Sequence, residues 1–218
     1  MLSTWYQIVI FLVFIPQLCF AQVVSHPFIP REGKLLIIGQ QKDAIEEYVK
    51  STKVIPGGFM VYTSIQIMDA LDRPGNHGAG IQHAQYYIKR YPDTVIQLGL
   101  YMVGAVDKIL TGMYDDNILK LAKWMKKAQR PIYFRIGYEF DLPDNRYDPK
   151  KYQQAYRYIV DRLRNQGVNN VAYVWHSAAM MESKGILWIG IRAMIMWIGL
   201  RYQYLIQCRL ILLIILRL

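Results

Sequence analysis

A regular alternation of short apolar runs with amphipathic segments is the feature of this sequence that most constrains its fold. The apolar runs begin near positions 34, 57, 94, 131 and 171, so they recur at similar intervals along the middle of the chain. A segment with helical periodicity lies in each gap. This spacing predicts successive βα units and a parallel sheet. The predicted strands are 34–39, 57–64, 94–102, 131–140 and 171–176, and the predicted helices are 43–50, 82–90, 118–129 and 150–165.

Two parallel folds fit this alternation. A doubly wound sheet would carry a phosphate-binding glycine motif after one of its strands, but no G-x-G-x-x-G or G-x-x-x-x-G-K-[ST] follows any predicted strand. A (β/α)₈ barrel is therefore the better interpretation. Such a barrel needs about 250 residues, whereas five units already use the chain up to residue 179 of 218. The predicted fold class is α/β, an incomplete (β/α)₈ TIM barrel of about five βα units.

Charge is distributed unevenly along the chain. Lys and Arg outnumber Asp and Glu by 26 to 16, yet no acid precedes Glu32 and none occurs in 186–218. The last segment contains four arginines. Without them the excess of basic over acidic side chains is smaller, so the rest of the chain has the charge of a mildly basic globular protein. Lysines that follow acids along predicted helices indicate solvated faces. We therefore expect no nucleic-acid partner.

The amino-terminal segment, 1–21, has the pattern of a secretory signal peptide. An apolar run at 8–15 is followed by Pro16 and by the small residue Ala21. The run is too short for a membrane span of about 20 residues, although an uncleaved amino-terminal anchor is the alternative. The two cysteines, Cys19 and Cys208, leave 22–185 without any, so a secreted, extracellular domain would fold without disulfides. No stable membrane span is expected.

Polar and aromatic side chains follow the predicted strands at their carboxyl ends, where barrel enzymes build their sites. Glu139 ends a predicted strand that is otherwise apolar except for Arg135, so its carboxyl group is expected to point into an aromatic mouth and to act as a general acid. The alternative is that Glu139 pairs with Arg135 and orients a loop. The other residues at these ends are Tyr62, Ser64, Tyr101, Asp141, Trp175 and His176.

Several stretches resemble a known enzyme family. They are 131–145 (PIYFRIGYEFDLPDN), 171–177 (VAYVWHS), 56–58 (PGG) with 62–64 (YTS), and 99–102 (GLYM). Over residues 34–179 the chain is similar to the β-mannanase-type glycoside hydrolases of family 26. Tyr138 stands where characterised mannanases commonly have His, which leaves mannan, xylan and another β-glucan open as substrates.

The resemblance implies a retaining endo-hydrolase of a β-linked polysaccharide. We expect no cofactor or metal, and a monomer if the chain folds. The resemblance assigns the acid/base to Glu139, and a nucleophile to a second Glu at the end of a seventh strand. Substrate-binding roles fall to Arg135, Tyr101, Asp141, Trp175 and His176, with Tyr101 and Trp175 as stacking faces for sugar rings. His77 and His83 are expected to be surface residues.

The last segment, 186–218, differs from the rest in composition. More than half of it is Ile or Leu. Met and Trp are each encoded by a single codon, so this sequence determines some of the residues that a shifted reading frame would encode. They are Asp at Trp188–Ile189, Asp at Met194–Ile195, Val at Met196–Trp197 and Asp at Trp197–Ile198. These residues match the segment that leads into the sixth strand in the family. We therefore predict three parts: a signal peptide at 1–21, a partial hydrolase barrel at 34–180 and an out-of-frame apolar tail at 186–218.

A chain of this kind would lack the nucleophile. The resulting prediction is an inactive, truncated relative of the hydrolases. The alternatives are a non-catalytic carbohydrate-binding or unstable remnant, and a membrane protein anchored at both ends.

Overall fold

A sheet of five parallel strands forms the centre of the computed structural model, which describes residues 28, 34–178, 205–208 and 211–215. Its order follows the sequence, so each strand pairs with the next strand of the sheet along the chain. The strands are β1 (Ile37–Gly39), β2 (Gly58–Ser64), β5 (Val95–Tyr101), β6 (Ile132–Ile136) and β7 (Val171–His176). The predicted α/β fold of five βα units is confirmed, and the barrel is not closed.

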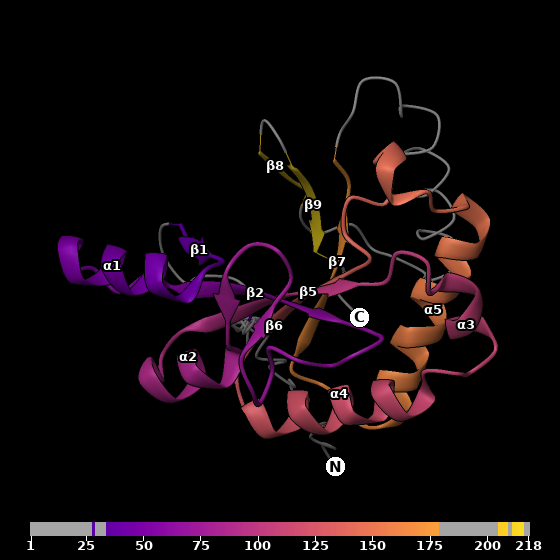
Figure 1. Ribbon diagram of the computed structural model, residues 1–218, viewed down its shortest axis with the longest axis horizontal. Helices are drawn as coiled ribbons and strands as arrows, with labels where there is room; N and C mark the ends of the chain where they lie inside the picture. Colours follow the sequence, from indigo (N-terminus) through magenta and orange to yellow (C-terminus); the bar gives the residue numbers. More distant parts are fainter. Residues whose placement is uncertain (1–27, 29–33, 179–204, 209–210, 216–218) are drawn as a thin grey trace, which may run out of the picture.

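Helices lie in an arc around the outside of these strands (Figure 1). They are α1 (Lys42–Thr52), α2 (Ala84–Arg90), α3 (Val106–Leu110), α4 (Asp115–Ala128) and α5 (Pro149–Asn165), with a 3₁₀ turn, η1 (Pro143–Asn145), before α5. Each predicted helix is present within a few residues of its expected bounds. Helix α3 and a two-stranded hairpin, β3 (Gly75–Asn76) and β4 (Ile81–Gln82), were not predicted.

Side chains alternate between two apolar layers along the strands, as the pleat of a strand requires. One layer packs between sheet and helices; on β6 it includes Phe134 and Ile136. The other lies on the concave side, where Tyr133 packs against Phe28, Ala172 and Val174. The Tyr133 hydroxyl also donates a hydrogen bond to the Phe28 carbonyl. The concave layer fills the amino-terminal end of the strands and leaves the carboxyl ends for polar groups.

The described part of the tail adds two antiparallel strands beyond β7. Strand β9 (Ile211–Ile215) pairs with β7, and β8 (Leu205–Cys208) pairs with β9. Because a sixth barrel strand would be parallel to β7, this hairpin extends the sheet without continuing the βα repeat, and the sheet stays open as expected. The rest of 186–218, and the predicted signal peptide at 1–21, lie outside the described residues.

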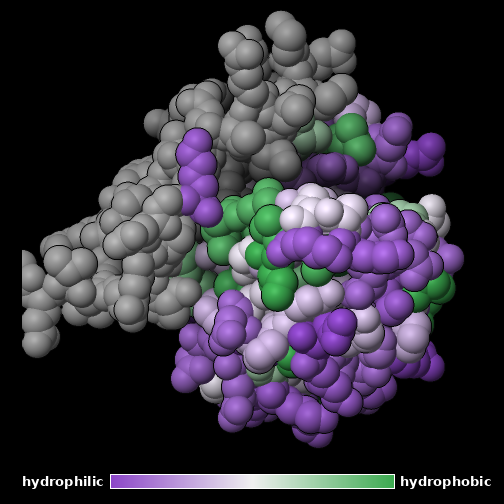
Figure 2. All heavy atoms as spheres, turned by 90° about the vertical axis from the view of Figure 1, so that its left-hand side faces the viewer, coloured by the Kyte–Doolittle hydropathy of each residue, from purple (hydrophilic) through white to green (hydrophobic). Residues whose placement is uncertain are grey.

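The opposite edge of the sheet, at β1, has no further strand among the described residues. The side of the molecule seen in Figure 2 is mainly hydrophilic with a smaller apolar area. Exposed apolar side chains near this edge include Leu36, Val54 and Ile55. An open strand edge with apolar neighbours favours association with other chains.

The fourth strand ends earlier than its sequence predicts. Strand β6 stops at Ile136, because Gly137 and Glu139 both adopt positive φ, +53° and +54°. A Cβ at Gly137 would lie 2.6 Å from Met102 Cε and 2.8 Å from the Tyr152 ring, and the positive φ strains other side chains, so this bend favours glycine. The expectation that the strand runs to residue 140 and closes on Glu139 is therefore wrong. Glu139 belongs to the loop that follows.

Helix α5 begins one residue before its predicted start and ends at its predicted last residue. Asp148 is the N-cap, and its side chain accepts a hydrogen bond from the Lys151 backbone N–H at 2.8 Å. Pro149 is the first helical residue, and Gly167 follows the helix with φ +72°. The helix packs Tyr152, Tyr156 and Ile159 onto the sheet.

We predict that Asp148→Ala lowers the free energy of unfolding by about 1 kcal/mol, because the cap of α5 is lost. Urea denaturation followed by circular dichroism measures this change. Asp161→Ala removes the same charge from an exposed position further along α5 and should change stability much less. Equal effects of the two substitutions would contradict a capping role for Asp148.

Candidate active site

A cavity of about 430 Å³ lies at the carboxyl ends of β2, β5 and β6. The register places Tyr62 beside Gly99 and Gly99 beside Arg135, so the three strand ends meet there. The lining residues are Gln40, Tyr62, His77, Ala79, Gln82, Tyr101, Tyr138 and Glu139. Among these described residues Glu139 is the one carboxylate. The cavity therefore combines one acid with three tyrosines.

Arg135 holds the aromatic wall of this cavity together. Its side chain is 3% exposed, and its guanidinium lies 5.0 Å from the ring centre of Tyr62 and 5.4 Å from that of Tyr138. The two rings meet edge to face at 4.8 Å. Arg135 Nη2 also donates to Met60 Sδ at 3.1 Å. These are cation–π contacts to neutral rings, and burial raises the pKa of Tyr138, which keeps that ring neutral.

Arg135 and Glu139 do not form an ion pair in the described structure. The alternative interpretation, that Glu139 merely pairs with Arg135, is therefore not what the structure has. Arg135 lies behind the tyrosines instead of reaching the carboxyl group. A substrate contact by Arg135 would need access past those rings.

The loop after β6 positions Glu139 through its backbone. The Glu139 carbonyl accepts hydrogen bonds from Asn145 Nδ2 at 2.8 Å and from the Leu142 N–H at 3.0 Å. The next residue, Phe140, donates its N–H to the His176 carbonyl at 3.4 Å, which ties the loop to the end of β7. Glu139 is half-buried, and its side chain lines the cavity. The carboxyl group is thus available to a ligand.

Asp141 has a different role in the same loop. Its side chain is buried, with Oδ2 accepting from Ser177 Oγ at 2.5 Å and Oδ1 accepting from the Ala178 N–H at 2.6 Å. Both carboxylate oxygens therefore bind residues that follow β7. Asp141 fixes the loop of Glu139 relative to β7, and the structure does not place it on the cavity wall, where the resemblance would put a substrate contact.

Trp175 lies on the opposite side of the sheet from the cavity. It is 2% exposed and packs against Phe140, Tyr152 and Tyr156, with ring centres 4.6, 5.2 and 5.1 Å away. The ring of Trp175, which was expected to stack on a sugar, is therefore covered by core residues on the helix side of the sheet. Tyr101, by contrast, is 40% exposed and lines the cavity, where its ring is accessible.

His176 follows Trp175 on β7 and is 2% exposed. Neither ring nitrogen has a hydrogen-bond partner among the described residues. Burial and then the nearby Arg135 guanidinium lower the pKa of His176 to about 4, while Asp141 acts in the opposite direction. The imidazole is thus neutral near pH 7, and it is not a lining residue of the cavity.

The sequence analysis assigned no ligand role to several cavity residues, among them His77 and Gln82. His77 is exposed, as expected, but it also lines the cavity, and its Nε2 lies 3.0 Å from Asp69 Oδ1. Gln82 is fully buried and also lines the cavity. Both belong to the β3–β4 hairpin, which the glycine-rich stretch 74–80 signals as a turn without indicating its contacts.

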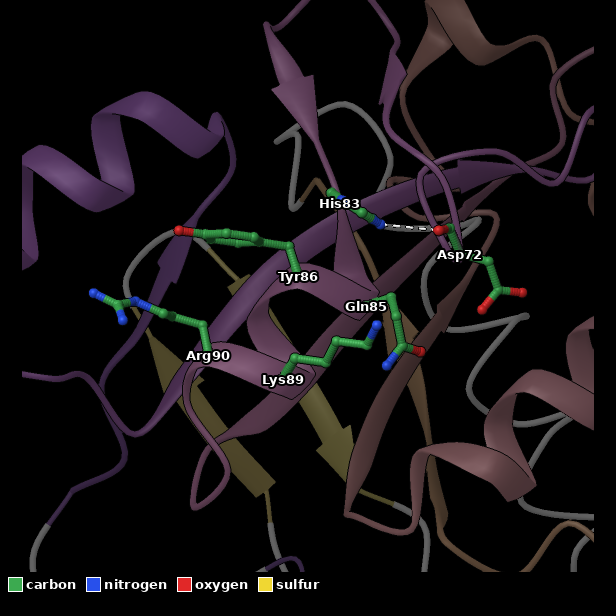
Figure 3. A pocket seen from close by; sticks show the side chains of 6 residues that line it. All are labelled: Asp72, His83, Gln85, Tyr86, Lys89 and Arg90. Carbon is green, nitrogen blue, oxygen red and sulfur yellow. Dashed lines mark hydrogen bonds between the residues drawn. The ribbon is translucent and has the colours of Figure 1, made fainter.

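A second hollow, of about 440 Å³, lies over α2 (Figure 3). It is lined by Asp72, His83, Gln85, Tyr86, Lys89 and Arg90. His83 bonds to the Asp72 carbonyl at 3.0 Å through its ring, and the side chains of Lys89 and Arg90 are exposed. None of its lining residues lies on a strand of the parallel sheet, and Glu139 is not among them, so it is not the candidate active site.

Two curated proteins are similar in sequence: a Beta-1,3-xylanase TXYA from a Vibrio species and a Beta-1,3-xylanase from an Alcaligenes species. Each is 28% identical over 187 residues, which cover 84% of this chain and 40% of the relative. The chain is similar to glycoside hydrolases. This similarity confirms the resemblance to glycoside hydrolases stated from the sequence. The chain spans about two fifths of the length of these relatives. No protein-family model matches it.

Two solved structures are also similar. A GH26 beta-mannanase from Bacteroides ovatus, BoMan26A, has 19% identity and a TM-score of 0.42, and the match covers 54% of this chain and 43% of that one. The YdhT protein from Bacillus subtilis has 14% identity and a TM-score of 0.47, with 66% and 55% covered.

Two further features concern the described residues alone. They contain no helix with the length and apolar character that crossing a membrane requires. They also contain no group of three or more His, Cys, Asp or Glu side chains placed to hold a metal ion.

We predict that stability falls as the pH drops from about 6.5 to about 4. The folded state holds His176 neutral, whereas the unfolded chain binds a proton near pH 6.5, so acid favours unfolding by about 1.4 kcal/mol per pH unit at most. Urea denaturation at pH 7, 5.5 and 4.5 measures this slope. His176→Gln should flatten it relative to the unmodified chain, and His83→Gln should not. Parallel pH profiles for all three proteins would contradict a neutral, buried His176.

Proposed function

We propose that residues 34–178 form the acid/base half of a retaining glycoside hydrolase site that acts on a β-linked polysaccharide. One observation carries this proposal: Glu139 is the only carboxylate among the described residues that line an aromatic cavity at the strand ends. The similarity to two xylanases supports it. In this role Glu139 donates its proton to the leaving glycosidic oxygen and later accepts one from water.

The substrate class follows from the named relatives. Both are called Beta-1,3-xylanases, which favours a β-1,3-linked xylan over the mannan that the resemblance to family 26 first implied. Tyr101, exposed on the cavity wall, is the available stacking face for a sugar ring. Mannan and β-1,4-xylan are the comparison substrates. We also propose a polysaccharide partner, a secreted location and a monomeric state.

A retaining mechanism needs two carboxyl groups about 5 to 5.5 Å apart. The described cavity lining supplies Glu139 alone. We propose that this chain does not hydrolyse polysaccharide, because the predicted shift of reading frame after His176 would remove the strand that carries the second carboxylate in the family it resembles. Binding of carbohydrate without hydrolysis is the second candidate function, favoured by the three tyrosines that remain in the cavity.

The printed chain should show no hydrolysis of β-1,3-xylan, β-1,4-xylan or mannan above a buffer control, because losing the nucleophile removes the covalent route. A reducing-sugar assay measures turnover, and size exclusion with circular dichroism verifies that the protein is folded. A monodisperse chain that releases sugar from any of these polymers would contradict the missing nucleophile.

In a protein with the reading frame restored beyond His176, Glu139→Gln should lower turnover by about 10²- to 10⁴-fold. The loss should be greatest for substrates with poor leaving groups, since these depend most on protonation. The near-isosteric change should leave the fold intact. Glu47→Gln, an exposed change of the same kind on α1, is the matched control. Unaltered turnover in the Glu139 variant would move the acid/base role to another residue.

A further inference from the structure

The β3–β4 hairpin forms one wall of the cavity and is held closely against its neighbours. Gly80, in its turn, has φ +84°, and a Cβ there would collide with the Gln41 side chain. Just after the hairpin in the sequence, the Ala84 N–H donates a hydrogen bond to the Ala70 carbonyl at 2.8 Å. The last residue of β4, Gln82, is therefore fixed in position from both sides.

One end of the Gln82 amide closes the edge of the sheet. Strand β1 pairs with β2 only as far as Gly39 beside Met60. The N–H of Tyr62, two positions further along, points toward the same edge, beyond the last residue of β1. Gln82 Oε1 accepts this N–H at 2.7 Å and takes the place of a strand carbonyl.

The other end of the same amide has no partner in the described structure. Gln82 is fully buried, and its Nε2 finds no hydrogen-bond acceptor among the described residues. A buried donor left without an acceptor is costly. Closing the sheet edge needs only an acceptor oxygen, which a glutamate would also supply. The two N–H groups of the amide are the part that the fold does not use.

We infer that Gln82 is a specificity-determining residue, whose amide N–H groups donate to a hydroxyl or ring oxygen of a sugar bound beside Glu139. This inference rests on the proposed function and names a donor for that site. Because Oε1 is anchored on the Tyr62 backbone, the amide cannot turn over and offer its oxygen instead. The site therefore presents a donor of fixed direction to the polysaccharide.

The test is calorimetric binding of β-1,3-xylotetraose to the full printed chain and its variants. Gln82→Glu keeps an acceptor for Tyr62 and removes the amide donors, so affinity should fall about tenfold. The buried carboxyl group should also lower the melting temperature, so circular dichroism verifies that the variant is folded. Gln82→Met tests the same donors without burying a charge and should lose affinity to a similar extent. Gln85→Glu, the same change on α2 outside the cavity, should bind within twofold of the unmodified chain.

Each result decides the matter. A tenfold loss in Gln82→Glu, or in Gln82→Met if the first variant does not fold, with Gln85→Glu unaffected, supports a donor role. Unmodified binding by either folded Gln82 variant would show that Gln82 only closes the sheet edge, while leaving the proposed function intact. Absence of binding by the unmodified chain to β-1,3-xylotetraose, β-1,4-xylotetraose and mannotetraose would overturn the proposed function and this inference together.

Discussion

Parallel pairing of β2, β5, β6 and β7 is the constraint on which the candidate site depends. Because the strands run in one direction, residues distant in the sequence reach the same edge of the sheet. Tyr62, Tyr101 and Glu139 meet there although they come from three separate βα units of the chain. At the other end of the strands, Tyr133 and Phe28 fill the concave side with apolar atoms. Chemistry and packing are thus assigned to opposite ends of the same strands.

The buried charge of Arg135 influences the rest of this edge. Taking a guanidinium out of water costs several kcal/mol, and each cation–π contact returns about 0.5 to 2 kcal/mol. The rings of Tyr62 and Tyr138 therefore offset only part of the cost. The Arg135 charge also contributes to the low pKa of His176. Since Tyr138 precedes Glu139 directly, the same contact holds the start of the loop that carries the proposed acid.

Much of the fold could be predicted from the sequence, because most of its strands and helices have clear periodicity. Strand β7 has the predicted bounds, and the cap of α5 is read directly from Asp148 and Pro149. The end of β6 could not be predicted, since the positive φ of Gly137 and Glu139 leaves no trace in the apolar pattern of the strand. The very short strands β3 and β4 give no periodic signal.

The site was predicted less completely than the fold. Trp175 and His176 were both assigned to the ligand, although neighbouring residues of a strand face opposite sides. That rule, applied to the sequence, would have separated them. The contacts of His77 with Asp69 and of Gln82 with Tyr62 join segments through a turn whose geometry the sequence does not specify. Glu139 and Tyr101 were found through their positions at the ends of predicted strands, to which the family resemblance added roles, and both line the cavity.

The location of the ligand site tests this account most directly. The chain, labelled with ¹⁵N, would be titrated with β-1,3-xylotetraose while amide chemical shifts are recorded. The account predicts the largest changes at Tyr62, Gln82 and Glu139, around the cavity at the strand ends. Changes confined to Gln85, Tyr86 and Arg90, at the hollow over α2, would contradict it.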